Sequence, residues 1–121
     1  MVLAAPSTPS THHVINAEAL SRMKNSAVVV NIARGSLIDQ NALVEALYTN
    51  KIGGALLDVM DPEPINTDEL LLSAPNVIVT LHVSGLTDQY APRIMELFVD
   101  NLWRFSRSES LINEVDIARG Y

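Results

Sequence analysis

Three side chains in this sequence have the types and the placement that suit acid–base work on a carboxylic acid. Arg34, Glu63 and His82 each follow a short apolar run. A guanidinium presents two parallel donors that match a carboxylate, and a histidine exchanges a proton near neutral pH. A carboxylate that hydrogen-bonds the histidine orients it and favours its imidazolium form. This set would let His82 protonate a carbonyl oxygen while a hydride reaches the carbon.

Each of these residues also has a more ordinary interpretation. An arginine after a strand is usually a surface or ion-pair residue, and a glutamate in an acidic loop is usually solvated. A histidine at a strand end is usually structural, and Asp58, which closes another apolar run, has the alternative role of a turn cap. The residues alone leave the functional and the structural interpretations about equally open.

The elements that must position these residues alternate between apolar runs and amphipathic stretches. The apolar runs, rich in β-branched residues, predict strands at 2–5, 27–32, 55–59 and 77–81. The amphipathic stretches predict helices at 17–24, 40–49 and 88–105. This order is typical of an α/β protein, and it predicts an open parallel sheet with flanking helices and with its strands adjacent in sequence order.

The carboxyl ends of parallel strands meet at one edge of a sheet, and ligands bind there in open α/β folds. Arg34, Asp58, Glu63 and His82 all follow such strand ends. We therefore expect these four side chains to converge on one cleft, with Glu63 and His82 within hydrogen-bonding distance.

Composition excludes several classes of protein. The 121 residues are 48% hydrophobic and 18% charged, which favours a folded domain or part of one. The net charge of −6 predicts no nucleic-acid or membrane partner.

The sequence offers no set of metal ligands. It contains no cysteine for disulfides or thiolate metal sites, and His12 and His13 lack metal-ligand spacing. We therefore expect no metal and interpret both histidines as exposed or packing residues. The apolar run that ends at Pro6 is too short for a signal peptide or a membrane span, which predicts a soluble cytoplasmic protein.

Three motifs, in this order, resemble the D-isomer-specific 2-hydroxyacid dehydrogenases. VVVNIARGSLID at 28–39 resembles the second signature of the family, and GALLDVMDPEP at 54–64 resembles the third. PNVIVTLHVSG at 75–85 resembles the segment with the catalytic histidine, and NEVDIARGY at 113–121 resembles the C-terminus of the family. The resemblance covers nearly the whole chain, is nearest to glyoxylate/hydroxypyruvate reductase-like members, and implies a partial Rossmann-type sheet.

The resemblance implies three catalytic residues. Arg34 matches the arginine that binds the substrate carboxylate, Glu63 matches the partner of the histidine, and His82 matches the proton donor. It also implies an NAD or NADP cofactor, with Asp58 holding the nicotinamide amide. The implied cofactor contacts are Ala5, Pro6, Thr11, Ile32, Ala33, Arg34, Asp58, His82, Val83, Ser84 and Gly85. Leu81 replaces the proline that usually precedes the histidine, which affects the geometry of the loop but removes no chemistry.

The resemblance implies an oxidoreductase that transfers a hydride between NAD(P)H and a 2-keto acid or D-2-hydroxy acid, and a homodimer in the intact enzyme. No Gly-x-Gly-x-x-Gly occurs in the sequence. The chain 1–121 is therefore expected to be the C-terminal part of the NAD-binding domain, without its glycine-rich first half and without the substrate domain. The alternative is a non-catalytic α/β binding or dimerising fragment. Cofactor binding by the isolated chain separates the two.

Overall fold

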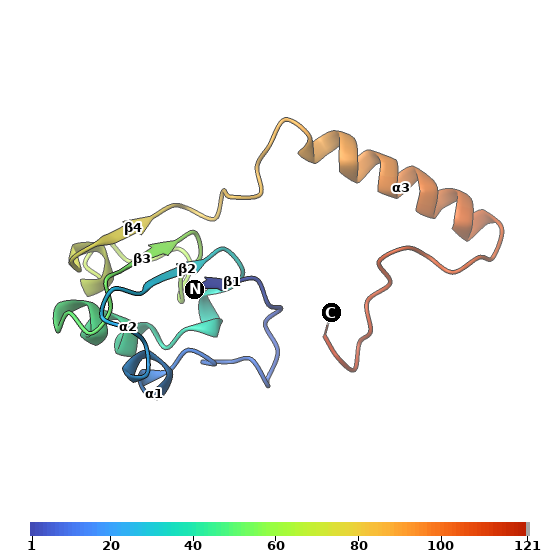
Figure 1. Cartoon of the computed structure of the whole chain (residues 1–121). Coiled ribbons are helices and arrows are strands. Elements are labelled where there is room, and N and C mark those ends of the chain that lie inside the picture. The colour runs from blue at the N-terminus through green and yellow to red at the C-terminus, as the bar shows by residue number, and fades with distance from the viewer. Residues whose placement is uncertain (121) are drawn as a thin grey trace. The chain divides into compact units, whose positions relative to one another are not determined.

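The computed structural model describes residues 1–120, which fall into two compact units that divide after Ser84 (Figure 1). The first unit holds a four-stranded sheet of β1 (Val2–Leu3), β2 (Val28–Asn31), β3 (Gly54–Leu57) and β4 (Val77–Val79). All neighbouring strands are parallel, and their spatial order follows the sequence. The predicted α/β fold is confirmed. Each strand is shorter than the apolar run that predicts it, because residues at the carboxyl end of the run leave the ladder to build a loop.

Two helices of the first unit start where the sequence offers a capping side chain. In α1 (Ala17–Ser21), Asn16 Oδ1 accepts a hydrogen bond from the Ala19 amide at 3.0 Å. In α2 (Gln40–Tyr48), Asp39 Oδ1 accepts one from the Ala42 amide at 3.1 Å. Such caps satisfy amide groups that the first turn leaves without a partner. Two short 3-10 helices complete the unit, η1 (Gly35–Leu37) and η2 (Leu70–Ser73).

The core of the first unit lies between the sheet and the helices α1 and α2. Figure 1 shows α1 and α2 on the same side of the sheet. The buried leucines of these helices, Leu20, Leu43 and Leu47, form one hydrophobic cluster with alternate residues of β2 and β3. The strand residues in this cluster include Val29, Ala55 and Leu57. Alternate strand residues point to opposite faces, so one face of the sheet carries the core.

The opposite face of the sheet carries an apolar row. Val2 pairs with Val30, Val30 with Leu56, and Leu56 with Ile78, so the four side chains follow one line across all four strands. Val2 and Ile78 are each 62% exposed. Within residues 1–84, flanking helices therefore cover one face of the sheet.

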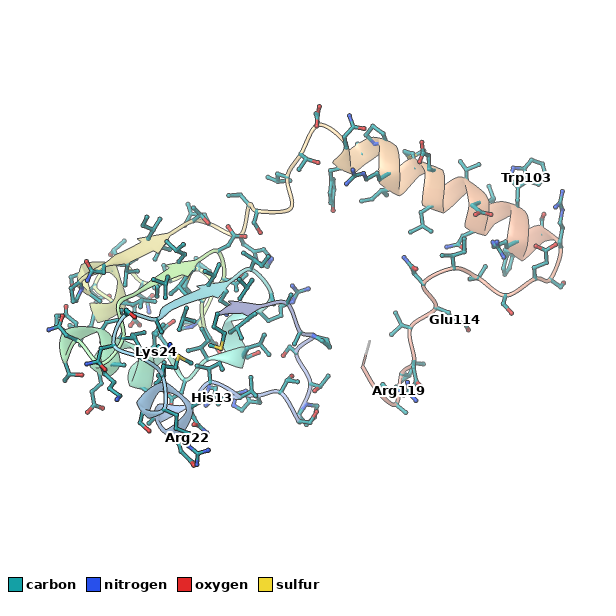
Figure 2. All side chains as sticks on the ribbon, in the orientation of Figure 1. His13, Arg22, Lys24, Trp103, Glu114 and Arg119 are labelled. Atoms are coloured by element: carbon teal, nitrogen blue, oxygen red, sulfur yellow. The ribbon has the colours of Figure 1, made fainter. Side chains whose placement is uncertain are left out.

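The second unit contains α3 (Tyr90–Ser106) and the segment that follows it, close to the predicted helix 88–105. The side chain of Asn101 ties the segment to the helix, because its Nδ2 donates to the Ile112 carbonyl at 3.0 Å and its Oδ1 accepts from the Ile112 amide at 2.7 Å. Trp103 stands out from the helix (Figure 2), with the guanidinium of Arg107 5.7 Å from its ring centre. No helix within residues 1–120 is long and apolar enough to cross a membrane.

Gly35 allows the backbone of η1 to touch the loop that follows β3. A Cβ atom at this position would lie 1.8 Å from the Met60 carbonyl oxygen and 2.1 Å from its carbon. Only a residue without a side chain permits this approach. The contact joins the loops that carry Arg34 and Glu63, so the geometry of the site depends on it.

Replacement of Gly35 by alanine is expected to lower the free energy of unfolding by about 1–3 kcal/mol, as overpacking does, because the added Cβ meets backbone atoms that cannot rotate away. Urea denaturation followed by circular dichroism measures the change. Gly85→Ala is the matched control, since nothing lies within 4 Å of a Cβ there, and it should shift stability by less than about 0.5 kcal/mol. Equal stability of the two variants would contradict the close approach.

Candidate active site at the carboxyl edge of the sheet

The turn that presents Arg34 is held by a buried polar side chain. Asn31, the last residue of β2, is fully buried. Its Nδ2 donates to the Arg34 carbonyl at 2.8 Å, and its Oδ1 accepts from the Ala33 amide at 3.1 Å. A buried amide with both groups paired fixes the local backbone, because loss of either bond leaves a polar group unsatisfied. The Arg34 side chain is exposed beyond this turn, and its Nη1 donates to the Ala33 carbonyl at 2.6 Å.

The loop after β1 is bound to η1, which follows Arg34. Ser7 and Ser36 join their hydroxyl groups at 2.8 Å, and the His13 amide donates to the Ser36 carbonyl at 2.9 Å. Within the loop, the Thr11 hydroxyl donates to the Pro6 carbonyl at 2.8 Å. These bonds give the turn that carries Arg34 a second support besides Asn31.

Glu63 and His82 form a hydrogen-bonded pair. His82 Nδ1 lies 2.9 Å from Glu63 Oε2, while Glu63 Oε1 accepts the Met60 amide at 2.8 Å. The His82 side chain is 50% exposed and that of Glu63 is 33% exposed. Burial raises the pKa of Glu63, but the hydrogen bonds from His82 and Met60 and the positive charges of His82 and Arg34 outweigh it, so the net pKa lies below its ordinary value. Glu63 is therefore an ionised acceptor that fixes the orientation of the His82 ring.

Asp58, the residue after β3, is a buried carboxylate at the same edge of the sheet. Only 4% of the residue is exposed, and its carboxylate accepts hydrogen bonds from the Thr80 hydroxyl, the Val83 amide at 3.0 Å and the Ser84 amide at 2.9 Å. Hydrogen bonds from Ser84 and Thr80 outweigh burial and hold the pKa of Asp58 far below its usual range. A carboxylate with several donors and little solvent keeps its charge, because the donors favour the ionised form.

Two adjacent hollows meet at Glu63. The larger, about 390 Å³, is lined by Met60, Glu63, Pro64, Ile65, Leu81 and His82. The other, about 260 Å³, is lined by Arg34, Gly35, Ser36, Met60, Asp61 and Glu63. Arg34 and His82 thus border neighbouring spaces that share Glu63. The arrangement offers a cation for an anionic group and, next to it, a titratable ring held by a carboxylate.

The structure distributes the predicted cofactor contacts over several loops. Ala5 and Pro6 follow β1, and Thr11 is engaged within the loop of residues 6–15. Ile32, which is 50% exposed, and Ala33 follow β2, while Val83 and Ser84 lie on Asp58. Gly85 belongs to the second unit. His12 and His13, interpreted as exposed or packing residues, stack on each other with ring centres 3.9 Å apart.

Sequence reasoning did not assign a role to Asn31 or Thr80. For Asn31 a signal existed, because a lone amide at the end of a buried apolar run needs partners inside the protein. Thr80 gave no such signal, since threonine is common in strands. Asn31 holds the backbone of the turn that carries Arg34, and Thr80 donates its hydroxyl hydrogen to the Asp58 carboxylate.

The low pKa of Asp58 has a consequence for stability. In the unfolded chain this carboxyl takes up its proton near pH 3.8, and in the folded chain at a lower pH. Its contribution to stability is therefore complete above about pH 5 and is lost as the pH falls below about 4 toward the folded-state pKa. The advantage of the wild type over Asp58→Asn in the midpoint of urea denaturation should be constant above pH 5 and shrink below pH 4.

The control for this pH series is Asp68→Asn, which changes an exposed carboxylate in the loop before η2. It should differ less from the wild type than Asp58→Asn does at pH 6. An Asp58→Asn difference of the same size at pH 3 and pH 6 would show that the ionised carboxylate is not the stabilising group.

The sequence of this chain matches a known family model and several curated proteins. The family model described as D-isomer specific 2-hydroxyacid dehydrogenase, NAD binding domain, matches residues 1–84. The glyoxylate reductase of Pyrococcus horikoshii is 43% identical over 109 residues, which cover 90% of this chain and 32% of that protein. The glyoxylate/hydroxypyruvate reductase B of Pectobacterium carotovorum is 41% identical over 102 residues, which cover 84% and 32%.

A solved structure agrees in three dimensions. The crystal structure of a D-isomer specific 2-hydroxyacid dehydrogenase from Xanthobacter autotrophicus, in complex with NADPH and MES, superposes with a TM-score of 0.91 at 35% identity, covering 99% of this chain and 49% of that one. The chain spans about a third to two fifths of the length of the first curated relatives it matches. Since the family model covers more than two thirds of its residues, the chain belongs to the D-isomer specific 2-hydroxyacid dehydrogenase family.

Proposed function

We propose that this chain supplies the acid–base and carboxylate-binding residues of an oxidoreductase that reduces a 2-keto acid, or oxidises the D-2-hydroxy acid, with NADH or NADPH. The observation that carries the proposal is the contact of 2.9 Å between Glu63 Oε2 and His82 Nδ1, beside the exposed guanidinium of Arg34. The names of the relatives support a small 2-keto acid such as glyoxylate or hydroxypyruvate.

The three residues have separate tasks in this proposal. Arg34 binds the substrate carboxylate through its two parallel donors, which places the adjacent carbonyl near His82. His82 gives the proton of Nε2 to the carbonyl oxygen and takes one back from solvent after product leaves. Glu63 keeps Nδ1 as a donor and stabilises the imidazolium by its charge.

The residues present fit a nicotinamide cofactor in chemical character. Ile32 and Leu81 are exposed apolar side chains at the ends of two strands, and Leu81 lines the hollow beside His82. Apolar surface of this kind suits a flat ring. When bound, the nicotinamide supplies or accepts the hydride. In our proposal Ile32, Ala33, Val83, Ser84, Gly85, Asp58, Arg34 and His82 hold its nicotinamide side, and Ala5, Pro6 and Thr11 hold its adenosine side.

For the whole enzyme we propose an assembly larger than this chain. Residues 1–121 would form the C-terminal part of the NAD-binding domain, with the glycine-rich segment and the substrate domain supplied by further sequence. We propose a cytoplasmic homodimer that acts on small molecules, without nucleic acid or membrane as a partner. The net charge of −6 supports the absence of such anionic partners.

A chimera tests the catalytic assignment. The 121 residues replace the matching part of the Pyrococcus horikoshii glyoxylate reductase, and turnover of glyoxylate with NADH and NADPH is measured. His82→Ala should lower kcat by about 10²–10⁴-fold, the usual contribution of a general acid, with little change in cofactor affinity. Arg34→Lys should lower kcat/KM by about 10- to 100-fold, because a point charge does not replace two parallel donors.

Two matched variants serve as controls in the chimera. His12→Ala changes another exposed histidine, and Arg22→Lys changes an exposed arginine directly after α1 (Figure 2). Both should keep the activity of the parent chimera. Normal turnover after His82→Ala or Arg34→Lys would remove that residue from the mechanism.

The isolated chain is expected to bind NADH weakly or not at all and to have no measurable turnover. The sequence contains no glycine-rich phosphate loop, and backbone donors at such a loop hold the pyrophosphate. The loss should be roughly a thousandfold in affinity relative to an intact relative, at about 1.4 kcal/mol per tenfold. Titration of the purified chain with NADH, followed by fluorescence, gives the dissociation constant. Micromolar binding with turnover would contradict this expectation.

A further inference from the structure

Three consecutive backbone amides around the active-site histidine all donate to one residue. The His82 amide donates to the Asp58 carbonyl at 2.7 Å. The Val83 amide donates to Asp58 Oδ1 at 3.0 Å, and the Ser84 amide donates to Oδ2 at 2.9 Å. Asp58 therefore holds the backbone on which the His82 ring stands, although it does not touch the ring itself.

The backbone of His82 needs such support. Its φ angle is 56°, in the left-handed region that residues with a side chain rarely adopt. This conformation persists only when the surrounding structure imposes it. Two carboxylates, both close to the end of β3, act on the same residue: Asp58 on the backbone and Glu63 on Nδ1 of the ring.

We propose that Asp58 is a positioning residue for His82, whose carboxylate holds residues 82–84 so that Nδ1 faces Glu63 and Nε2 is left for the substrate. This role is distinct from the contact with the nicotinamide amide that the family resemblance implies for Asp58. The inference rests on the proposed function only in naming His82 as the proton donor.

The position of the ring decides which nitrogen does the chemistry. When the imidazolium gives its Nε2 proton to the carbonyl oxygen, the ring becomes neutral and keeps the proton on Nδ1, already bonded to Glu63. No rearrangement of the ring accompanies the transfer. Without the support of Asp58, the φ angle of His82 would relax, Nδ1 would leave Glu63, and the neutral ring would no longer favour the tautomer that the reaction leaves behind.

Nitrogen NMR of the histidine rings tests this inference on the 121-residue chain itself. Long-range proton–nitrogen spectra report which ring nitrogen of His82 carries the proton in the neutral form. We expect the Nδ1–H tautomer to predominate in the wild type. In Asp58→Asn, an amide NH2 replaces one acceptor oxygen and opposes a backbone amide, so the Nδ1–H fraction of His82 should fall and the tautomers of His12 and His13 should not change.

Two further variants separate positioning from a general effect. Thr80→Val removes one donor to the Asp58 carboxylate and leaves the backbone amides in place, so the His82 tautomer should stay as in the wild type. Glu63→Gln removes the charge at Nδ1 and should change the His82 tautomer without exposing the amides of residues 82–84. A change of nearby charge alters the protonation of any histidine. The tautomer instead reports which ring nitrogen of His82 is hydrogen-bonded to Glu63.

Hydrogen exchange in the wild type keeps the inference testable if Asp58→Asn does not fold. The amides of His82, Val83 and Ser84 should exchange slower than in an unfolded chain by at least about tenfold, as a block. Unprotected amides, or a folded Asp58→Asn variant with an unchanged His82 tautomer, would overturn the inference. Catalytic failure of the chimera with these NMR results intact would instead count against the proposed function alone.

Discussion

The parallel pairing of β3 with a neighbour on each side is the constraint on which the rest of the site depends. Because β2, β3 and β4 run in the same direction in register, their carboxyl ends open onto one edge. The exit of β3 is central at this edge, and it supplies Asp58 and, a few residues later, Glu63. Arg34 arrives from one neighbouring strand and His82 from the other. The contact between Gly35 and Met60 then fixes the separation of the loops that follow β2 and β3.

Two carboxylates at this edge have different tasks because their surroundings differ. Asp58 is buried, and its carboxylate accepts hydrogen bonds from the backbone amides of Val83 and Ser84, which keep it ionised. Glu63 is partly exposed, accepts the Met60 amide with one oxygen and contacts the His82 ring with the other. A carboxylate that supports a titrating group must itself remain ionised, and the lowered pKa of Glu63 satisfies that condition.

The sequence predicts the fold well because apolar runs rich in β-branched residues and capped amphipathic stretches are local signals, as at 27–32 and in the helix that begins after Asp39. The convergence of Arg34, Glu63 and His82 follows from topology, since it requires only that the strands be parallel and adjacent. Two features of the site were not predictable from the sequence: the hydrogen bonds of Asp58 to residues 82–84 and the left-handed conformation of His82. Both depend on contacts between segments more than twenty residues apart in the sequence. The role of Asn31 stood between these cases, visible as a polar residue in an apolar run but without a named partner.

The apolar row of Val2, Val30, Leu56 and Ile78 makes the tolerance of the chain to mutation alternate along each strand. Side chains such as Val29 and Leu57, which face the two helices, have close neighbours on every side and little freedom to change volume. Val2 and Ile78 on the other face have free space beside them, so polar replacements there remove little packing. Among the residues of the four strands, a comprehensive substitution library would therefore separate into two classes that alternate from one residue to the next. The restrictive class lies on the helix-covered face and includes Asn31 despite its polarity.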